Sequence, residues 1–285
     1  MASLYALIAR NAPRAVIFRR GPSKRVLLIA WDLANDTFEE GQWLNGRIYE
    51  RRCDLSPDGK LLLYFAASWR PPYQSWTAVS RPPYFTALAL WPKGDAWGGG
   101  GLFASPNTIA LNHFAHQITL ADEFSLRKDM LVTTLGPHAG RGEDDPIWSA
   151  RLERDGWTRT SSGKSIERYS RPPVWLELEP PLIWEKPHRV APLTLRMSIT
   201  GIKEQNGPWY RIEHALIGRD GATRTLRSSS WADWSHEGDL LYAIRGALFR
   251  ASFVEGALGE AKQLADFTDR TFVSRAAPPP MQRWR

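Results

Sequence analysis

The stretch CDLSPDGKLLLYFAAS, residues 53–68, decides the fold class, because a second version of it, WADWSHEGDLLYAIRG, follows at residues 231–246. Five positions agree in type: Ser56 with Ser235, Asp58 with Glu237, Gly59 with Gly238, Leu61 with Leu240, and Leu62 with Leu241. In the first copy proline presets φ at the first corner of a turn, and Asp-Gly tolerates the positive φ that reverses the chain. Each copy therefore predicts a tight turn between two antiparallel strands.

Short strands are predicted along the whole chain. A third, degraded copy of the motif, LFASPNTIALN at residues 102–112, again places a turn before an apolar run. Ten runs rich in β-branched, aromatic and aliphatic residues are bounded by turn-forming residues, as strands are. They cover residues 25–33, 61–68, 85–91, 108–114, 130–136, 174–179, 193–202, 209–218, 239–246 and 247–253. One short helix is expected over TLADEFSLRKDM, residues 119–130, which has acids in its first turn and bases near its end. The chain is therefore predicted to be all-β.

Two of these stretches, CDLSPDGKLLLYFA and ADWSHEGDLLYAIRGALFRASF, resemble the WD40-like repeat of TolB-type β-propellers. In that repeat an inner strand ends at Trp-Ser-Pro-Asp-Gly and the next strand begins at an apolar triplet. The tryptophan is Trp234 in the second copy, whereas Leu55 and Ala104 take its place in the other two. The resemblance implies four-stranded antiparallel blades packed around an axis, because one blade cannot bury both of its faces alone.

The expected architecture is a single-domain β-propeller of five blades over residues 1–285, with six blades as the alternative because repeats of about 40 to 45 residues also fit. The blades are expected at residues 1–45, 46–100, 101–165, 166–228 and 229–269, followed by a tail at 276–285. Residues 1–45 are expected to form three strands, and RTFVSR, residues 270–275, to supply the fourth. The N- and C-terminal strands would then close the ring within one blade.

Composition limits the classes of protein. Of 285 residues, 43% are hydrophobic and 12% are aromatic, including 14 Trp, which suits a packed core and is unlike disorder. The formal net charge of +7 favours contact with an acidic partner, such as a protein face, a nucleic-acid backbone or an anionic surface. Because Lys and Arg are spread among 30 acidic residues, nucleic acid is the less favoured of these partners.

Cysteine use and hydropathy indicate the compartment. Cys53 is the single cysteine, so the chain forms neither an internal disulfide nor a Cys-based zinc cluster, and nothing indicates an oxidising compartment. Arginines interrupt the residues after the short apolar run at the N-terminus, and no run of about 20 apolar residues occurs. A cytoplasmic protein, neither secreted nor inserted in a membrane, is expected.

The densest acidic group beside aromatic residues lies in WDLANDTFEEGQW, residues 31–43, and contains Asp32, Asp36, Glu39 and Glu40. Glycoside hydrolysis requires two carboxyl groups that face one cleft, so Asp32, Asp36 and Glu40 are the candidates for catalysis. The favoured interpretation is turn chemistry, in which Asp32 ends a strand and Asp36 belongs to a hairpin turn.

Other chemical motifs have ordinary structural interpretations. His113 and His116 follow a strand and are favoured as solvated or hydrogen-bonding side chains over zinc ligands. The run Gly98 to Gly101 lacks the Lys-Ser/Thr and the helix that follow a phosphate loop, so it is interpreted as a flexible turn between blades. Cys53 is expected to be a buried structural thiol. No cofactor and no metal are expected.

Three segments carry Arg-Pro-Pro among aromatic residues: SWRPPYQSW at 68–76, SRPPYF at 80–85 and SRPPVW at 170–175. The last is expected only to enter a strand, whereas the first two are expected within one long insertion at about residues 69–84 of the second blade. Proline lowers the ordering cost of binding, and exposed Arg, Tyr and Trp are frequent at interface hot spots. The expected partner-binding residues are Trp69, Arg70, Tyr73, Trp76, Arg81 and Tyr84.

The sequence therefore predicts a non-catalytic protein-interaction module or scaffold subunit of a larger cytoplasmic assembly. Its aromatic side chains would act as apolar anchors, and its arginines would meet an acidic protein surface. An enzyme that acts on a glycan or polar small molecule in the central channel is the alternative, and a nucleic-acid-binding subunit is the third interpretation.

Overall fold

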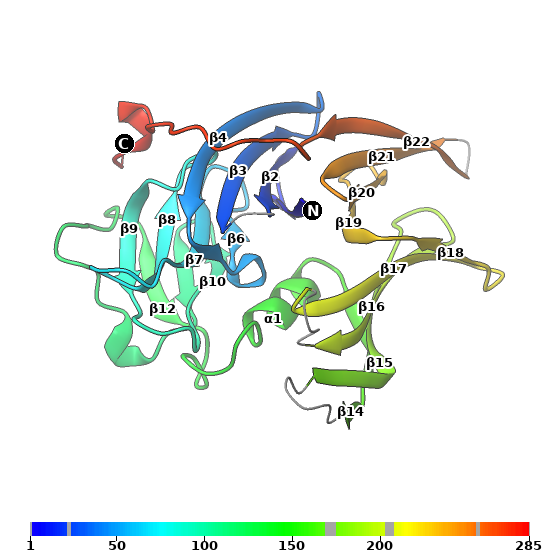
Figure 1. Ribbon diagram of the computed structural model, residues 1–285, viewed down its shortest axis with the longest axis horizontal. Helices are drawn as coiled ribbons and strands as arrows, with labels where there is room; N and C mark the ends of the chain where they lie inside the picture. Colours follow the sequence, from blue (N-terminus) through cyan, green and yellow to red (C-terminus); the bar gives the residue numbers. More distant parts are fainter. Residues whose placement is uncertain (1, 22–23, 169–174, 203–207, 255–256, 285) are drawn as a thin grey trace. The chain divides into compact units, whose positions relative to one another are not determined.

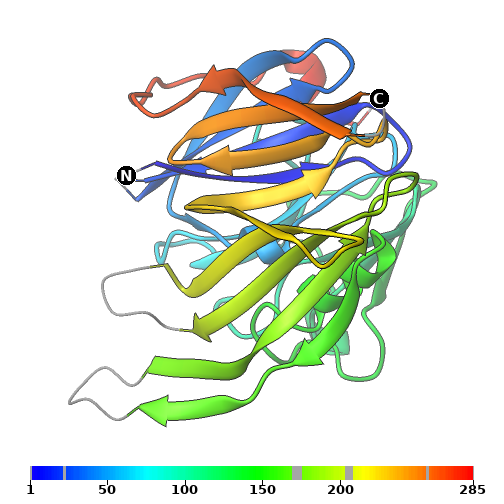
Figure 2. The same cartoon turned by 90° about the vertical axis from the view of Figure 1, so that its right-hand side faces the viewer.

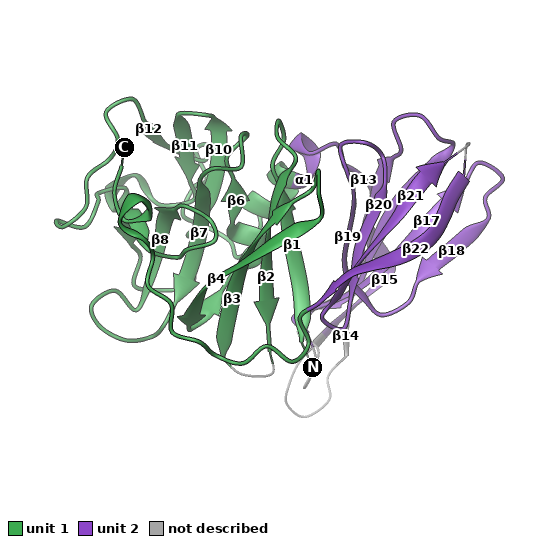
Figure 3. Ribbon diagram, turned by 90° about the horizontal axis from the view of Figure 1, so that it is seen from above, with its two compact units in different colours: residues 1–151, 267–285 green, residues 152–266 purple. Residues whose placement is uncertain are grey.

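The computed structural model describes residues 2–21, 24–168, 175–202, 208–254 and 257–284 (Figure 1). The chain divides into two compact units, of which unit 1 holds residues 1–151 and 267–285 and unit 2 holds residues 152–266 (Figure 3). Strands dominate the described residues, with one α-helix, α1 (Ile147–Arg154), and 3-10 turns at Glu50–Arg52, Ala115–Gln117 and Pro279–Met281. The prediction of an all-β chain is confirmed.

Unit 1 contains three sheets within its described residues. Sheet A has the strand order β1-β2-β3-β4, sheet B the order β5-β7-β8-β9 with β6 also paired to β7, and sheet C the order β10-β11-β12. All pairs are antiparallel except β11 with β12, which is parallel. The strands are β1 (Ser3–Ile8), β2 (Arg14–Arg20), β3 (Arg25–Asp32), β4 (Thr37–Asn45), β5 (Arg47–Ile48), β6 (Asp54–Leu55), β7 (Leu62–Ala67), β8 (Ser75–Ser80), β9 (Ala87–Pro92), β10 (Gly101–Ser105), β11 (Thr108–Leu111) and β12 (Leu131–Thr134).

Sheet B is covered on both faces. Successive side chains of a strand point to opposite faces, so Leu62 and Tyr64 of β7 pack with Phe18 of sheet A. Leu63, between them, packs with Phe103 of sheet C. All six residues of β7 are buried as a result, which explains why its sequence is continuously apolar rather than alternating.

Unit 2 contains two antiparallel sheets, D and E, within its described residues (Figure 2). Sheet D has the order β13-β15-β16-β17-β18, with β14 also paired to β15, and sheet E the order β19-β20-β21-β22. Buried and half-buried side chains alternate along β16, as expected where one face of a sheet meets a core. The strands are β13 (Thr158–Ser162), β14 (Ser165–Arg168), β15 (Trp175–Pro187), β16 (Leu193–Ile202), β17 (Tyr210–Gly218), β18 (Thr223–Leu226), β19 (Ser229–Trp234), β20 (Leu240–Ile244), β21 (Ala247–Val254) and β22 (Ala257–Asp266).

The repeated motif forms the predicted hairpin turns. One copy joins β6 to β7 and the other joins β19 to β20, both antiparallel. The hydroxyl of Ser56 accepts a hydrogen bond from the N–H of Leu61 at 2.9 Å, and the hydroxyl of Ser235 accepts one from Asp239 at 3.0 Å. Gly59 has a φ of 72°, in the left-handed region that the turn requires.

The two copies also share an aspartate that connects neighbouring sheets. Asp54, buried in β6, accepts a hydrogen bond from the N–H of Phe103 in sheet C at 2.8 Å. Asp233, at the same place in the second copy, pairs with Lys186 of sheet D at 2.6 Å. The motif therefore supplies both the turn and a polar link to the adjacent sheet.

The positions of the sheets along the chain can be compared with the expected blade limits. Sheets A, B and E lie within residues 1–45, 46–100 and 229–269, whereas sheet D begins at Thr158 rather than near residue 166. Residues 1–45 form all four strands of sheet A, and the extended residues 270–275 are not a strand. The segment does not pair with sheet A, because main-chain groups of the outer strand β4 have other partners. The N–H of Gln42 donates to the carbonyl of Pro83 at 3.0 Å, and the carbonyl of Glu40 accepts from the side chain of Arg275.

The helix predicted over residues 119–130 is absent. That segment is irregular because its main chain and side chains bond and pack against sheet B. The N–H of Ala121 donates to the carbonyl of Leu90 at 3.0 Å, and Phe124 packs against the core between sheets A and B. The α-helix of the described chain, α1, follows Asp145 and Pro146 instead, and the Asp145 carboxylate accepts from the N–H of Ser149 at 3.2 Å.

The glycine run that connects sheet B to sheet C is packed, so its interpretation as a flexible turn is wrong. Gly98, Gly99 and Gly100 are buried and have φ between 66° and 82°. The carbonyl of Gly98 accepts from the buried guanidinium of Arg52 at 2.8 Å, and a Cβ added at Gly99 would lie 2.3 Å from the ring of Phe65.

We predict that Gly99→Ala lowers the free energy of unfolding by at least about 2 kcal/mol, because it combines a left-handed φ with a clash against Phe65. Gly94→Ala is the matched control: its φ is 83°, but nothing lies within 4 Å of an added Cβ. Denaturant unfolding of both variants checks this, and equal losses would contradict the packing argument.

Candidate functional site

The strand β8 separates the residues predicted to bind a partner. Trp69, Arg70 and Tyr73 lie in the loop from β7 to β8, whereas Arg81 and Tyr84 lie in the loop from β8 to β9. A strand of six residues spans about 20 Å, so the two loops are at opposite ends of sheet B. The expected single insertion at residues 69–84 is therefore wrong. Trp76, on β8 itself, is half-buried against the core between sheets A and B.

One end of sheet B presents two exposed indoles. The side chain of Trp69 is 55% exposed and that of Trp97 is 64% exposed, and Arg70 beside Trp69 is exposed as well. We call Trp69, Arg70 and Trp97 the tryptophan end. The sequence had pointed to two of these residues; Trp97 was missed, although its place between a polar turn and a glycine run was a signal.

The loop that carries Trp69 is held by its own backbone. The N–H groups of Ser68 and Trp69 both donate to the carbonyl of Gln74, at 2.8 and 2.9 Å, and Gln74 donates to the carbonyl of Arg70 at 2.9 Å. Trp69 has a φ of 57°, which is rare for a bulky side chain. The loop is therefore fixed with its indole in solvent.

A neighbouring loop fixes Trp97. The Asp95 carboxylate accepts from the N–H of Trp97 and from the Lys93 ammonium, both at 2.8 Å. Ser75, the first residue of β8, ties this loop to the sheet: its carbonyl accepts from the N–H of Lys93 at 3.0 Å, and its hydroxyl donates to the carbonyl of Asp95. Trp97 and Trp69 are therefore held at the same end of sheet B.

The two tyrosines of the Arg-Pro-Pro-Tyr segments are engaged within the molecule. Tyr73 is half-buried and donates to the carboxylate of Glu123, a hydrogen bond that raises the pKa of its hydroxyl. Tyr84 is only 7% exposed and donates to Glu39 at 3.5 Å. Tyr84 is thus part of the packed structure, and its expected role as an exposed anchor is not what the fold provides.

The candidate catalytic carboxylates have structural partners. Asp32 accepts from the N–H of Ala34 at 2.9 Å, and Asp36 accepts from the indole of Trp31 at 3.1 Å, so both stabilise the β3–β4 hairpin as the turn interpretation expected. Glu40 pairs with Arg270 at 2.5 Å. The three acids therefore serve the hairpin and the C-terminal segment.

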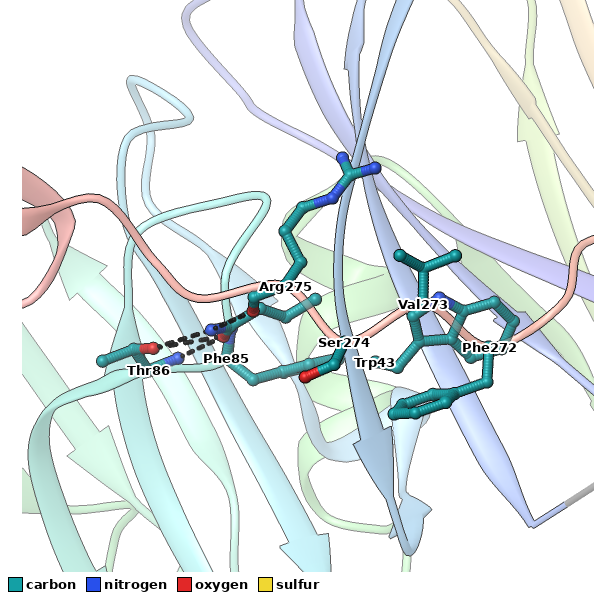
Figure 4. A pocket seen from close by; sticks show the side chains of 8 residues that line it. Trp43, Phe85, Thr86, Phe272, Val273, Ser274 and Arg275 are labelled. Carbon is teal, nitrogen blue, oxygen red and sulfur yellow. Dashed lines mark hydrogen bonds between the residues drawn. The ribbon is translucent and has the colours of Figure 1, made fainter.

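The other end of sheet B borders a hollow of about 290 Å³ (Figure 4). Its lining comes from β4, the β8–β9 loop and the C-terminal segment: Gln42, Trp43, Phe85, Thr86, Phe272, Val273, Ser274 and Arg275. The Gln42 side chain joins these parts, because its oxygen accepts from the N–H of Phe85 at 2.7 Å and its nitrogen donates to the carbonyl of Arg275 at 3.1 Å. None of the eight residues is acidic.

His113 is a buried hydrogen-bonding side chain. Thr77 accepts from the N–H of Gly100 at 2.7 Å and directs its hydroxyl to Nε2 of His113 at 2.8 Å, while Nδ1 lies 3.0 Å from the carbonyl of Gln117. Burial lowers the pKa of this imidazole to about 4. His116 is exposed and stacks on Phe114.

We predict an acid-sensitive fold. An unfolded histidine takes up its proton near pH 6.5, whereas folded His113 stays neutral to about pH 4, so stability is complete above pH 6.5 and falls as the pH drops from 6.5 to 4. The loss over this range is about 3 kcal/mol. Unfolding titrations of His113→Gln should show a shallower pH dependence than those of the wild type, and equal slopes in the two proteins would refute this.

Cys53 is buried, as predicted, with its thiol 3.2 Å from the carbonyl of Tyr49. Burial raises the pKa of this thiol, which keeps it protonated. Within the part of the chain that the structure describes, no three His, Cys, Asp or Glu side chains gather as a metal site would require. No helix there is long and apolar enough to cross a membrane. The segment SRPPVW lies outside the described residues apart from Trp175 in β15.

Comparison with known proteins assigns no family. No family model matches the chain, and no curated protein matches it. Among solved structures, dihydro-heme d1 dehydrogenase NirN in complex with DHE aligns with 93% of this chain and 67% of its own, at 14% sequence identity and a TM-score of 0.39. A likeness this slight leaves the function to be inferred from the sites themselves.

Proposed function

We propose that this protein is a non-catalytic interaction module of a larger cytoplasmic assembly, and that it binds an acidic protein partner through the tryptophan end. The observation that carries the proposal is the pair of exposed indoles, Trp69 and Trp97, each held by backbone hydrogen bonds at one end of sheet B. Tryptophan and arginine are the side chains most enriched at interface hot spots.

The energetics of this end favour binding. A loop that is already ordered loses little conformational entropy when a partner docks, so more of the contact energy becomes affinity. The left-handed φ of Trp69 costs on the order of 1 kcal/mol, and such strain is commonly kept where a side chain has a function. Placing a large indole in water at that cost gives the folded protein itself no evident benefit.

Charge supports an acidic partner. The chain carries a net charge of +7, and Arg70 is exposed beside Trp69. A guanidinium next to an indole can pair with a carboxylate while the indole buries apolar surface. Catalysis has less support, because Asp32, Asp36 and Glu40 are engaged in the hairpin and in an ion pair.

We further infer that the sheets are blades of one β-propeller with five blades. In unit 1, sheets A and B share one apolar core and sheets B and C share another, which is the face-to-face contact that neighbouring blades make. Five sheets in the described residues match five blades in number. Loops at the ends of blade strands would then present the tryptophan end.

The decisive variant is Trp69→Ala combined with Trp97→Ala. Immobilised wild type and variant are incubated with native lysate, the enriched protein is identified and purified, and its Kd for each form is measured by calorimetry. We expect the double variant to bind at least about 30-fold more weakly, the loss of about 2 kcal/mol that defines a hot spot.

Val190→Ala is the matched control, because Val190 is 88% exposed and lies on unit 2. It should bind as wild type does. A Kd unchanged in the double variant would place the interface elsewhere, and a partner lost equally by the control would show that the enrichment was non-specific.

A further inference from the structure

The C-terminal strap, which we define as residues 267–278, is anchored on unit 1 as an extended segment. Phe267 is buried, and its carbonyl accepts from the buried guanidinium of Arg19 at 2.9 Å. The carboxylate of Glu40 forms an ion pair with Arg270, and the main-chain carbonyl of Glu40 accepts a hydrogen bond from the side chain of Arg275. Both ends of the extended stretch 270–275 are therefore fixed.

Between these anchors the main chain is unpaired. Across the described residues, Thr271, Phe272, Val273 and Ser274 make no hydrogen bond through their N–H or C=O groups. All four residues are exposed and belong to no strand. Extended main chain whose donors and acceptors face water is a template to which another strand can add.

The unpaired stretch borders a hollow whose lining includes both apolar and polar side chains. Phe272 is 46% exposed and packs edge-on against Trp43 at 6.2 Å between ring centroids, while Val273 is 53% exposed. These side chains line the hollow of about 290 Å³ together with Phe85 (Figure 4). Its volume lies at or below the lower limit of ordinary ligand sites, so it suits one or two side chains better than a cofactor.

Three arginines lie around the unpaired stretch, beside the acids Glu40 and Asp269. The guanidinium of Arg25 lies 4.0 Å from the centre of the Phe272 ring, and Arg270 and Arg275 flank the unpaired stretch. Glu40 occupies one nitrogen each of Arg270 and Arg275, and a guanidinium has further donors for a second carboxylate.

We propose that the C-terminal strap is a second binding site, to which an extended segment of a partner protein, alternating in aliphatic and acidic residues, adds as a β-strand. The segment pairs with the main chain of residues 271–274, places an aliphatic side chain in the hollow and directs carboxylates to the arginines. This second site lies at the opposite end of sheet B from the tryptophan end and binds by a different chemistry. The proposal does not depend on the tryptophan end.

The test uses the full chain and a fluorescein-labelled octapeptide of alternating glutamate and valine, with binding followed by fluorescence anisotropy. We expect saturable binding that weakens between about 50 and about 300 mM salt, because the carboxylates are steered by exposed arginines. Peptides of alternating lysine and valine, or of glutamate and serine, should bind at least about tenfold more weakly.

Two variations isolate main-chain pairing. The same octapeptide with N-methylated valines keeps its side chains but loses half of its N–H donors, and it should bind wild-type protein at least about tenfold more weakly. Val273→Pro should have a similar effect, because proline removes an N–H from the strap, whereas Val273→Ala keeps it. Thermal melting confirms that each variant is folded.

The outcomes are distinct. Equal binding of the N-methylated peptide, or no saturable binding of the parent peptide, overturns the proposal. Sedimentation over a wide concentration range tests whether a second copy of this chain occupies the strap. A dimer that Val273→Pro abolishes would show that the strap binds another copy of the chain and would overturn the proposal of a partner segment. The Trp69→Ala, Trp97→Ala double variant should bind the octapeptide normally, so failure of one site leaves the other untouched.

Discussion

The burial of sheet B on both faces constrains everything else in unit 1. Because Leu62 and Leu63 of β7 face two different cores, no side chain in the middle of that strand is available to a ligand. Functional groups are therefore confined to the ends of the strands and to segments laid over the sheets. Both sites inferred for this protein follow that rule: the tryptophan end lies where β7 ends and β8 begins, and the strap crosses β4 next to the β8–β9 loop.

Much of the fold could be predicted from the sequence because its signals are local. The Ser-Pro-Asp-Gly turn is stabilised by its own side chains: the hydroxyl of Ser56 donates to Asp58 and accepts from the N–H of Leu61, both within five residues. The prediction of a helix at residues 119–130 was wrong because its capping pattern was local as well. In the folded chain the N–H of Ala121 donates to Leu90 and Phe124 packs against the core between sheets A and B, and the local pattern does not show these distant contacts. The strand expected at 270–275 failed for a related reason, since nothing in that hexapeptide shows that sheet A already has four strands.

The candidate site was less predictable, because exposure is a property of the folded chain. Arg-Pro-Pro-Tyr occurs at residues 70–73 and 81–84, yet its first copy stands in solvent at Arg70 and its second copy is largely covered. What differs is the surroundings: the first loop leaves Trp69 and Arg70 exposed, whereas the second packs so closely on β4 that a Cβ at Gly41 would lie 1.8 Å from the carbonyl of Pro83. Glu40 was singled out for its charge, but its partners Arg270 and Arg275 come from the far end of the chain.

The anchoring of Arg19 has a consequence for biosynthesis. The carbonyls of Phe267 and Thr268, which accept from its buried guanidinium at 2.9 and 2.5 Å, lie almost 250 residues further along the chain. While the ribosome is still making unit 2, only one of the three carbonyls that accept from Arg19 exists, that of Gly21, and burying an incompletely paired cation is costly. Unit 1 can therefore reach its final packing only after residues 267 and 268 have left the exit tunnel, so the first strands to emerge belong to a unit that is among the last to be completed.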